Sequence, residues 1–195
     1  AFNTAGSAGA QDAVSGRDEV TGAFWILGAG NVQKIGRYLS GSGWTSWDID
    51  NPDMPSNCKA AVAGSLEVMA FITAAGGVRA VDLRSTPAIY TPSTTGTGPG
   101  EMLSLEWDAA GARFVGRADD GGKTVWFLTP SGAPYSGGSA WAWSSTTPSG
   151  GATPPNEAGT GTHGRLRVVT MAGERGLLYL PGPSSVPHFF RAGVA

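Results

Sequence analysis

The stretch from Val115 to Trp126 is the feature that most limits how this chain can fold. Apolar residues precede and follow an Asp-Gly-Gly turn, with Phe114 and Val115 on one side and Val125–Leu128 on the other. This arrangement is typical of a β-hairpin, because glycine allows the positive backbone angles of tight turns. A similar segment, Ile35–Trp47, also begins with an apolar residue, Gly and Arg, and crosses a glycine-rich turn. The sequence therefore favours repeated hairpins.

The hairpins recur along the chain. Arg37 and Arg117 are about 80 residues apart, so a third copy is expected halfway if the unit has the roughly 40 residues of a propeller blade. The segment Met69–Arg84 fits, because it repeats the strand, Ala-Gly turn and strand of Phe24–Ile35. Met171–Gly173 marks a fourth turn of this kind. We expect an all-β fold of four degenerate β-meander repeats, propeller-like or as stacked sheets, in a single domain over residues 21–195.

The turn before Trp126 resembles the Asp-box, or BNR repeat, of sialidase-like β-propellers. That pattern is roughly Ser-x-Asp-x-Gly-x-Thr-Trp, and Asp120, Gly122 and Thr124 hold its positions. Ala118 replaces the Ser, and one residue is inserted before Trp126. In that family the box is a structural brace and is not catalytic. The resemblance thus implies a structural turn made by Asp120, Gly122, Thr124 and Trp126, with Trp126 directed into the core; an ordinary Asp-Gly hairpin is the alternative.

Charge and hydropathy exclude two classes of partner. Only 14% of the residues are charged, the net charge is −2, and there is no basic cluster. A nucleic-acid surface needs such a cluster, so we expect no nucleic-acid partner. No apolar run approaches the roughly 18 residues of a spanning helix, so we expect no membrane span.

The sequence offers little chemistry. Cys58 is the only cysteine, and His163 and His188 lie in unrelated segments without a second ligand at metal spacing. Phosphate-loop, dinucleotide and nucleophile-elbow motifs are absent. Glu106 and Asp108 alternate with Leu105 and Trp107, which predicts that both acids lie on the solvent face of a strand. We therefore expect no enzymatic activity, no cofactor and no metal.

Two segments are candidates for contacts with partners. Residues 1–20 are polar and without a periodic apolar face, so they predict an extended N-terminal arm that other subunits hold in place. Residues 131–163 form the longest irregular stretch, and such long connections are usually functional or disordered. We expect binding of a partner or a glycan through exposed aromatic residues, namely Tyr135, Trp141, Trp143 and Trp44.

These features predict a non-enzymatic structural component of a larger assembly, and more specifically a bacteriophage-like virion protein of the tail, fibre or spike. Its localisation would be the virion, after synthesis in the cytoplasm. The low charge and the long Gly/Ser/Thr-rich connections support this hypothesis. The alternative is a carbohydrate-binding β-propeller, a lectin or adhesin that is secreted or on the cell surface and binds glycans on its aromatic residues.

Overall fold

The computed structural model describes residues 14–28, 34–49, 59–73, 75–100, 102–118, 122–131, 140–151, 153, 166–180 and 186–191. Within these ranges the chain forms β-strands and one short 3₁₀ turn, η2 (Gly64–Leu66), and no α-helix. The expected all-β fold is confirmed. The strands are β1 (Val14–Arg17), β2 (Phe24–Leu27), β3 (Lys34–Leu39), β4 (Gly43–Asp48), β5 (Lys59–Ala63), β6 (Val68–Ile72), β7 (Val78–Asp82), β8 (Ala88–Tyr90), β9 (Ser93–Thr95), β10 (Met102–Asp108), β11 (Arg113–Ala118), β12 (Val125–Thr129), β13 (Ala140–Thr146), β14 (Leu166–Met171), β15 (Glu174–Tyr179) and β16 (His188–Arg191).

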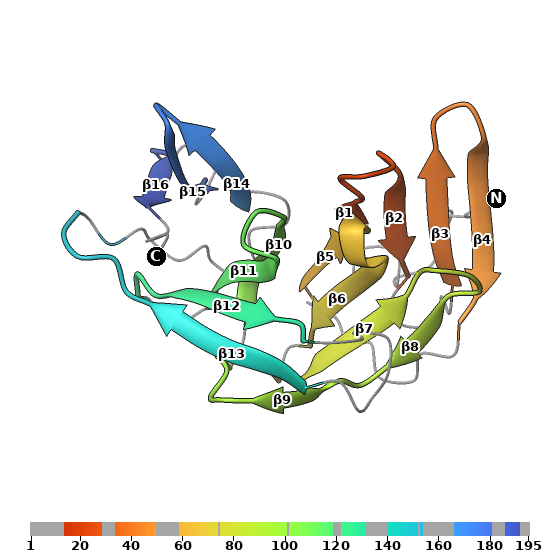
Figure 1. Ribbon diagram of the computed structural model, residues 1–195, viewed down its shortest axis with the longest axis horizontal. Coiled ribbons are helices and arrows are strands. Elements are labelled where there is room, and N and C mark those ends of the chain that lie inside the picture. The colour runs from red at the N-terminus through yellow and green to blue at the C-terminus, as the bar shows by residue number, and fades with distance from the viewer. Residues whose placement is uncertain are drawn as a thin grey trace.

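The described strands form four separate sheets in chain order (Figure 1). The first sheet is β1-β2-β3-β4, the second is β5-β6-β7-β8, and the fourth is β14-β15-β16. The third sheet has the order β10-β11-β12-β13-β9, in which β9 pairs in parallel with β13. All other pairs are antiparallel neighbours in sequence, so each sheet is a β-meander. The four predicted meander units are confirmed.

Successive sheets contact each other mainly through their first strands. Strand β1 packs against β5, β5 against β10, and β10 against β14. In Figure 1 the first sheet stands at the right and the fourth at the upper left, with the second and third between them. The first and fourth sheets are therefore the two ends of the series, and each has one face that no neighbouring sheet in the described chain covers.

A separate hydrophobic cluster fills each joint between sheets. One cluster joins Leu27 and Ile35 of the first sheet to Met69 and Phe71 of the second. In the next, small residues of the second sheet such as Ala70 face large rings of the third. All five residues of β6 are buried, because β6 has a neighbouring sheet on both faces. The third cluster lies between the third and fourth sheets.

The two Gly-Arg segments are not equivalent positions of the repeat. Arg37 lies in β3, the third strand of its sheet, whereas Arg117 lies in β11, the second strand of its sheet. At Gly116 the glycine has a local cause, because an added Cβ would collide with the Ser104 carbonyl oxygen. By contrast, Phe24–Ile35 and Met69–Arg84 both begin in the second strand of a sheet and continue into the third, as expected.

Part of the predicted N-terminal arm belongs to the domain. Residues Val14–Arg17 form β1, which pairs with β2, and Val14 is buried in the first cluster. The expectation that residues 1–20 form an arm outside the domain is wrong for this strand. Alternate side chains of a strand point to opposite faces, so a largely polar segment can still bury one side chain against the sheet. Residues 1–13 lie outside the described residues.

The expectation of an exposed aromatic loop over residues 131–163 is wrong for β13. The Ala-Trp-Ala-Trp alternation has the two-residue period of a strand, and it directs Trp141 and Trp143 into the second cluster. Trp141 has no exposed surface, and its ring stacks on Phe114 at 5.7 Å between centroids. Trp126 also packs against this cluster and remains partly exposed.

We predict that Trp141→Ala lowers the free energy of unfolding by about 3–5 kcal/mol, because it empties a ring-sized space in a closed core. The matched control is Trp44→Ala, the same change at a side chain that is 51% exposed, with an expected loss of about 0.5 kcal/mol. Chemical denaturation followed by circular dichroism measures both. Equal losses for the two variants would contradict the burial pattern.

Candidate functional site

Three aromatic side chains form a row across the outer face of the first sheet. The strand register places Phe24 opposite Tyr38 and Tyr38 opposite Trp44. Their exposed fractions are 39%, 42% and 51%, which are high values for large apolar side chains. Scattered exposed apolar residues are normal, but a contiguous group is typical of an interaction site. The row is therefore the strongest candidate site in the described structure.

The alternation of strand side chains explains why this row is exposed. In β2, Trp25 and Leu27 point into the first cluster, so Phe24 and Ile26 point to the other side. In β1, Val14 is buried, and Arg17 extends the row because it pairs with Phe24. We call this surface the first face. It consists of Ser15, Arg17, Phe24, Ile26, Lys34, Gly36, Tyr38, Trp44, Ser46 and Asp48, and Lys34 and Asp48 form an exposed ion pair on it.

The rings of the first face do not form one flat platform. The Tyr38 and Trp44 centroids are 5.4 Å apart, and the ring planes are tilted by 51°. A pyranose ring stacks on a flat aromatic face, whereas a protein side chain can pack between tilted rings. The two rings therefore do not offer a single plane to a stacking ligand.

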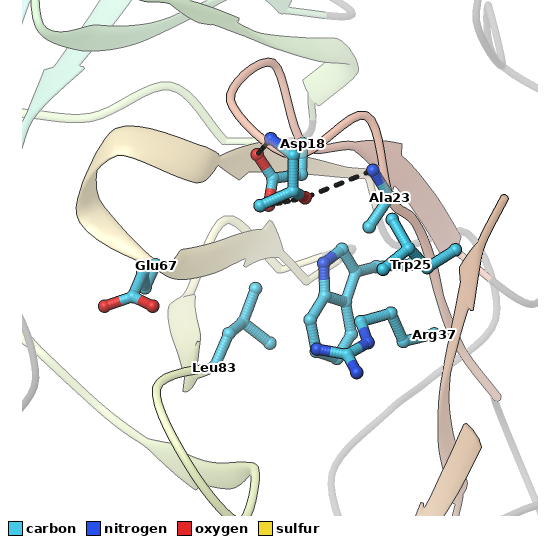
Figure 2. A pocket seen from close by; sticks show the side chains of 8 residues that line it. Asp18, Ala23, Trp25, Arg37, Glu67 and Leu83 are labelled. Carbon is cyan, nitrogen blue, oxygen red and sulfur yellow. Dashed lines mark hydrogen bonds between the residues drawn. The ribbon is translucent and has the colours of Figure 1, made fainter. Parts of the chain in front are cut away.

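A small pocket lies on the inner side of the first sheet, between it and the second. Figure 2 shows Trp25 and Arg37 on one side, Glu67 and Leu83 on the other, and Asp18 above them. The volume is about 90 Å³, well below the roughly 300 Å³ of the smallest drug-sized sites. The Asp18 carboxylate is engaged locally, because it accepts hydrogen bonds from the backbone N–H groups of Val20 and Thr21 at 2.8 and 3.0 Å.

Arg37 is held in the pocket wall by aromatic rings. Its guanidinium carbon lies 5.6 Å from the ring centroid of Trp25 and 5.8 Å from that of Trp47, within cation–π range. The two rings stack at 5.8 Å. The buried Nε of Arg37 and Nε1 of Trp25 have no hydrogen-bond partner among the described residues. The pocket can accommodate water or one small acceptor group at these two N–H donors.

Charged residues gather at the joint between the third and fourth sheets. Asp108 is buried and forms ion pairs with Arg113, at 3.4 Å, and with Arg175 of β15. Glu106 pairs with Arg167 of β14. The prediction that Asp108 lies on a solvent face is wrong, because the fourth sheet covers that face of β10. Glu106 is partly buried there.

Arg117 contacts the turn in which the Asp-box pattern lies. Its side chain has no exposed surface, its Nη2 donates to the Gly122 carbonyl at 2.6 Å, and its guanidinium lies 4.7 Å from the Tyr179 ring centroid. Thr124 exchanges a hydrogen bond with the hydroxyl of Thr147 at 3.1 Å. The hairpin between β11 and β12 is confirmed. Asp120 lies outside the described residues, so its role in the turn stays a prediction.

The structure separates Trp44 from the two other described residues of the predicted binding set. Trp44 is exposed on the first face, whereas Trp141 and Trp143 are buried in the second cluster. Tyr135 lies outside the described residues. Sequence reasoning missed Phe24 and Tyr38, because their alignment with Trp44 depends on strand register. The only available signal was the paired aromatic residues Phe24 and Trp25, which must point to opposite faces of a strand.

No protein-family model matches the chain, and no curated protein sequence matches it. Among the described residues, no group of three His, Cys, Asp or Glu side chains could hold a metal ion. The described part of the chain also has no helix long and apolar enough to cross a membrane.

The joint between the third and fourth sheets should make stability depend on pH. Burial raises the pKa of Glu106 above its usual 4.5, and this effect exceeds the opposing attraction of Arg167. The folded state therefore binds the proton more tightly than the unfolded state, and stability falls as pH rises from about 4.5 through the folded pKa. We predict that the Glu106→Gln variant lacks this decrease in stability. The free energy of unfolding of the variant should therefore increase relative to that of the wild type as pH rises from about 4.5 through the folded pKa of Glu106.

Asp82 provides a control of opposite sign. A hydrogen bond from Arg84 lowers the pKa of Asp82 below 3.8. The ionised form is thus favoured in the folded state, and its contribution is lost as pH falls through the folded pKa. Asp82→Asn should therefore cost stability at neutral pH and lose its effect in acid. Urea denaturation at a series of pH values measures both variants, and parallel profiles for the two would contradict these assignments.

Proposed function

We propose that the chain is a non-enzymatic structural subunit of a larger protein assembly. The observation that carries the proposal is the first face, a contiguous row of half-exposed aromatic residues on a sheet at the end of the series. Covering such a surface removes apolar area from water, at roughly 25 cal/mol per Å². Aromatic residues and arginine, both present here, are the types most enriched at the centres of protein interfaces.

The predicted contact through residues 1–20 is compatible with this surface. Ser15 and Arg17 belong to that segment, and both side chains lie on the exposed side of β1. An incoming subunit on the first face would therefore contact the start of the described chain as well as the aromatic row.

The kind of assembly is proposed from the sequence. Low charge, long Gly/Ser/Thr-rich connections and the lack of a recognisable active-site motif favour a virion component such as a tail, fibre or spike protein. A second candidate, a glycan-binding module of a secreted or surface protein, is favoured by one observation, the 51% exposure of Trp44. The tilt between Trp44 and Tyr38 makes it the weaker of the two.

The test is the size of the particle that contains the chain in extracts of its source cells. We expect the wild-type chain to sediment in particles much larger than the 19.8 kDa of one chain. Phe24→Ser with Trp44→Ser should shift it to slower fractions, whereas the turn variant Ser40→Lys with Ser42→Lys should not. The second candidate would be favoured if the wild-type chain sedimented as a single small protein and bound glycans on an array through Trp44.

A further inference from the structure

The wall of the pocket between the first and second sheets contains a cation without a partner. Within the described part of the chain, Arg37 forms no hydrogen bond and no ion pair, and its contacts are with the Trp25 and Trp47 rings. Its Nε is buried and unpartnered. A buried N–H without an acceptor costs free energy, and the planar guanidinium fork fits a carboxylate. We therefore expect an acceptor from outside the chain at this position.

A second donor lies in the same wall. Trp25 is 4% exposed, and its Nε1 has no hydrogen-bond partner. In Figure 2 the indole nitrogen lies on the edge of the ring that faces Asp18 and Glu67. Other buried indole N–H groups of the described chain also lack a partner but line no part of this pocket: Trp107, Trp126 and Trp141. In the pocket, by contrast, an unpartnered indole and an unpartnered guanidinium adjoin open space.

The acidic groups near the pocket differ in their engagement. The Asp18 carboxylate accepts a hydrogen bond from the Thr21 hydroxyl at 2.6 Å, in addition to those from two backbone N–H groups. Glu19 accepts hydrogen bonds from two backbone N–H groups of η2, at 2.8 and 3.0 Å. Glu67 has no hydrogen bond to its carboxylate and no ion pair within the described chain. Glu67 is therefore the carboxylate that can receive a donor from a ligand.

The backbone of Glu67 is strained in a way that packing does not explain. It ends η2 in the left-handed conformation, with φ 51° and ψ 42°. Glycine or asparagine is usual at such a position, because other side chains crowd the backbone there. Strained residues of this kind occur often at ligand sites. The Glu67 side chain is exposed and lines the pocket, so a contact with a ligand is a role that glycine could not supply.

The size and charge of the pocket limit what it can bind. The volume is about 90 Å³, several times the roughly 10–15 Å³ that one water molecule needs. This is enough for a molecule of a few non-hydrogen atoms. A simple anion would satisfy Arg37 but meet the like charge of Glu67, and a simple cation would meet the like charge of Arg37. A molecule with one group of each sign avoids both conflicts.

We propose that this pocket binds a small zwitterion, a molecule of about the size of glycine that carries a carboxylate and an ammonium group. The carboxylate accepts hydrogen bonds from the guanidinium of Arg37 and the indole N–H of Trp25, and the ammonium group donates to Glu67. The inference goes beyond the proposed function. The pocket lies on the inner side of the first sheet and the first face on its outer side, so either proposal can fail without the other.

The test is a titration of the purified full-length chain, labelled with ¹⁵N, followed by the indole N–H signals in NMR spectra. The signal that is missing from Trp25→Phe identifies Trp25. Glycine should shift this signal with a dissociation constant on the order of a millimolar, as expected for so small a ligand. Acetate and methylammonium, which each carry one half of the zwitterion, should bind on the order of tenfold more weakly. The signal of Trp141, buried in the second cluster, is the internal reference and should not move.

Variants assign the two ends of the ligand. Arg37→Gln should weaken the binding of glycine and of acetate on the order of tenfold, whereas Glu67→Gln should weaken only glycine. Glu67→Gly should also weaken glycine binding while the melting temperature stays the same or rises, because it relieves the left-handed backbone. The matched controls are Arg191→Gln and Glu174→Gln, the same changes at exposed residues of the fourth sheet, and they should bind like the wild type.

The outcomes are decisive in both directions. Saturable binding of glycine that both pocket changes weaken, and neither control weakens, supports the proposal. A Trp25 signal that does not move at glycine concentrations well above the millimolar range overturns it, and the pocket then holds water only. Equal binding of glycine and acetate, or binding that Glu67→Gln and Glu67→Gly leave unchanged, also overturns it. Both Glu67 variants change an exposed side chain, so this result does not depend on whether Arg37→Gln folds.

Discussion

The structure depends on the burial of the second sheet between two neighbours. Every side chain of β6 is buried, and the alternation of strand residues sends Met69 and Phe71 to the first sheet and Ala70 and Ile72 to the third. A sheet with two apolar faces cannot be stable in water unless both faces are covered. The first and third sheets are thus held in place by the same five residues, and their relative positions follow from one strand.

Large rings contact small side chains at the joint between the second and third sheets. Trp107, Phe114 and Trp141 fill the space that Ala61, Ala70 and Ala80 leave open. Close-packed interiors tolerate changes of total volume poorly, so the size of each ring is linked to the size of the residues it faces. Polar contacts at the other joints make the relative orientation of the sheets more specific than apolar packing alone would. An example is Glu19, which accepts hydrogen bonds from the backbone N–H groups of Gly64 and Ser65.

Local patterns predicted most of the fold. The alternation of Leu105, Glu106 and Trp107 and the Asp-Gly-Gly turn depend only on neighbours in sequence, and the structure has a strand and a hairpin at these positions. Asp108 could not be predicted to be buried, because its partner Arg175 lies in a different sheet. Trp141 was expected in an exposed loop, because the many glycine and proline residues around it obscure the short two-residue alternation of its strand. The row of Phe24, Tyr38 and Trp44 depends on the register of three strands, which the sequence of each strand alone does not determine.

The parallel pairing of β9 with β13 constrains the order in which the chain can fold. Strand β9 precedes the rest of its sheet in sequence, yet it occupies the outer edge beside the strand that is synthesised last in that sheet. During synthesis on a ribosome, β10, β11 and β12 can pair as they emerge, while Ser93–Thr95 must wait for Ala140–Ala142. Until then the edge of β12 is open to pairing with other chains. The pairing of β9 is therefore a late step in the formation of the third sheet, and an edge of that sheet stays open until the step is complete.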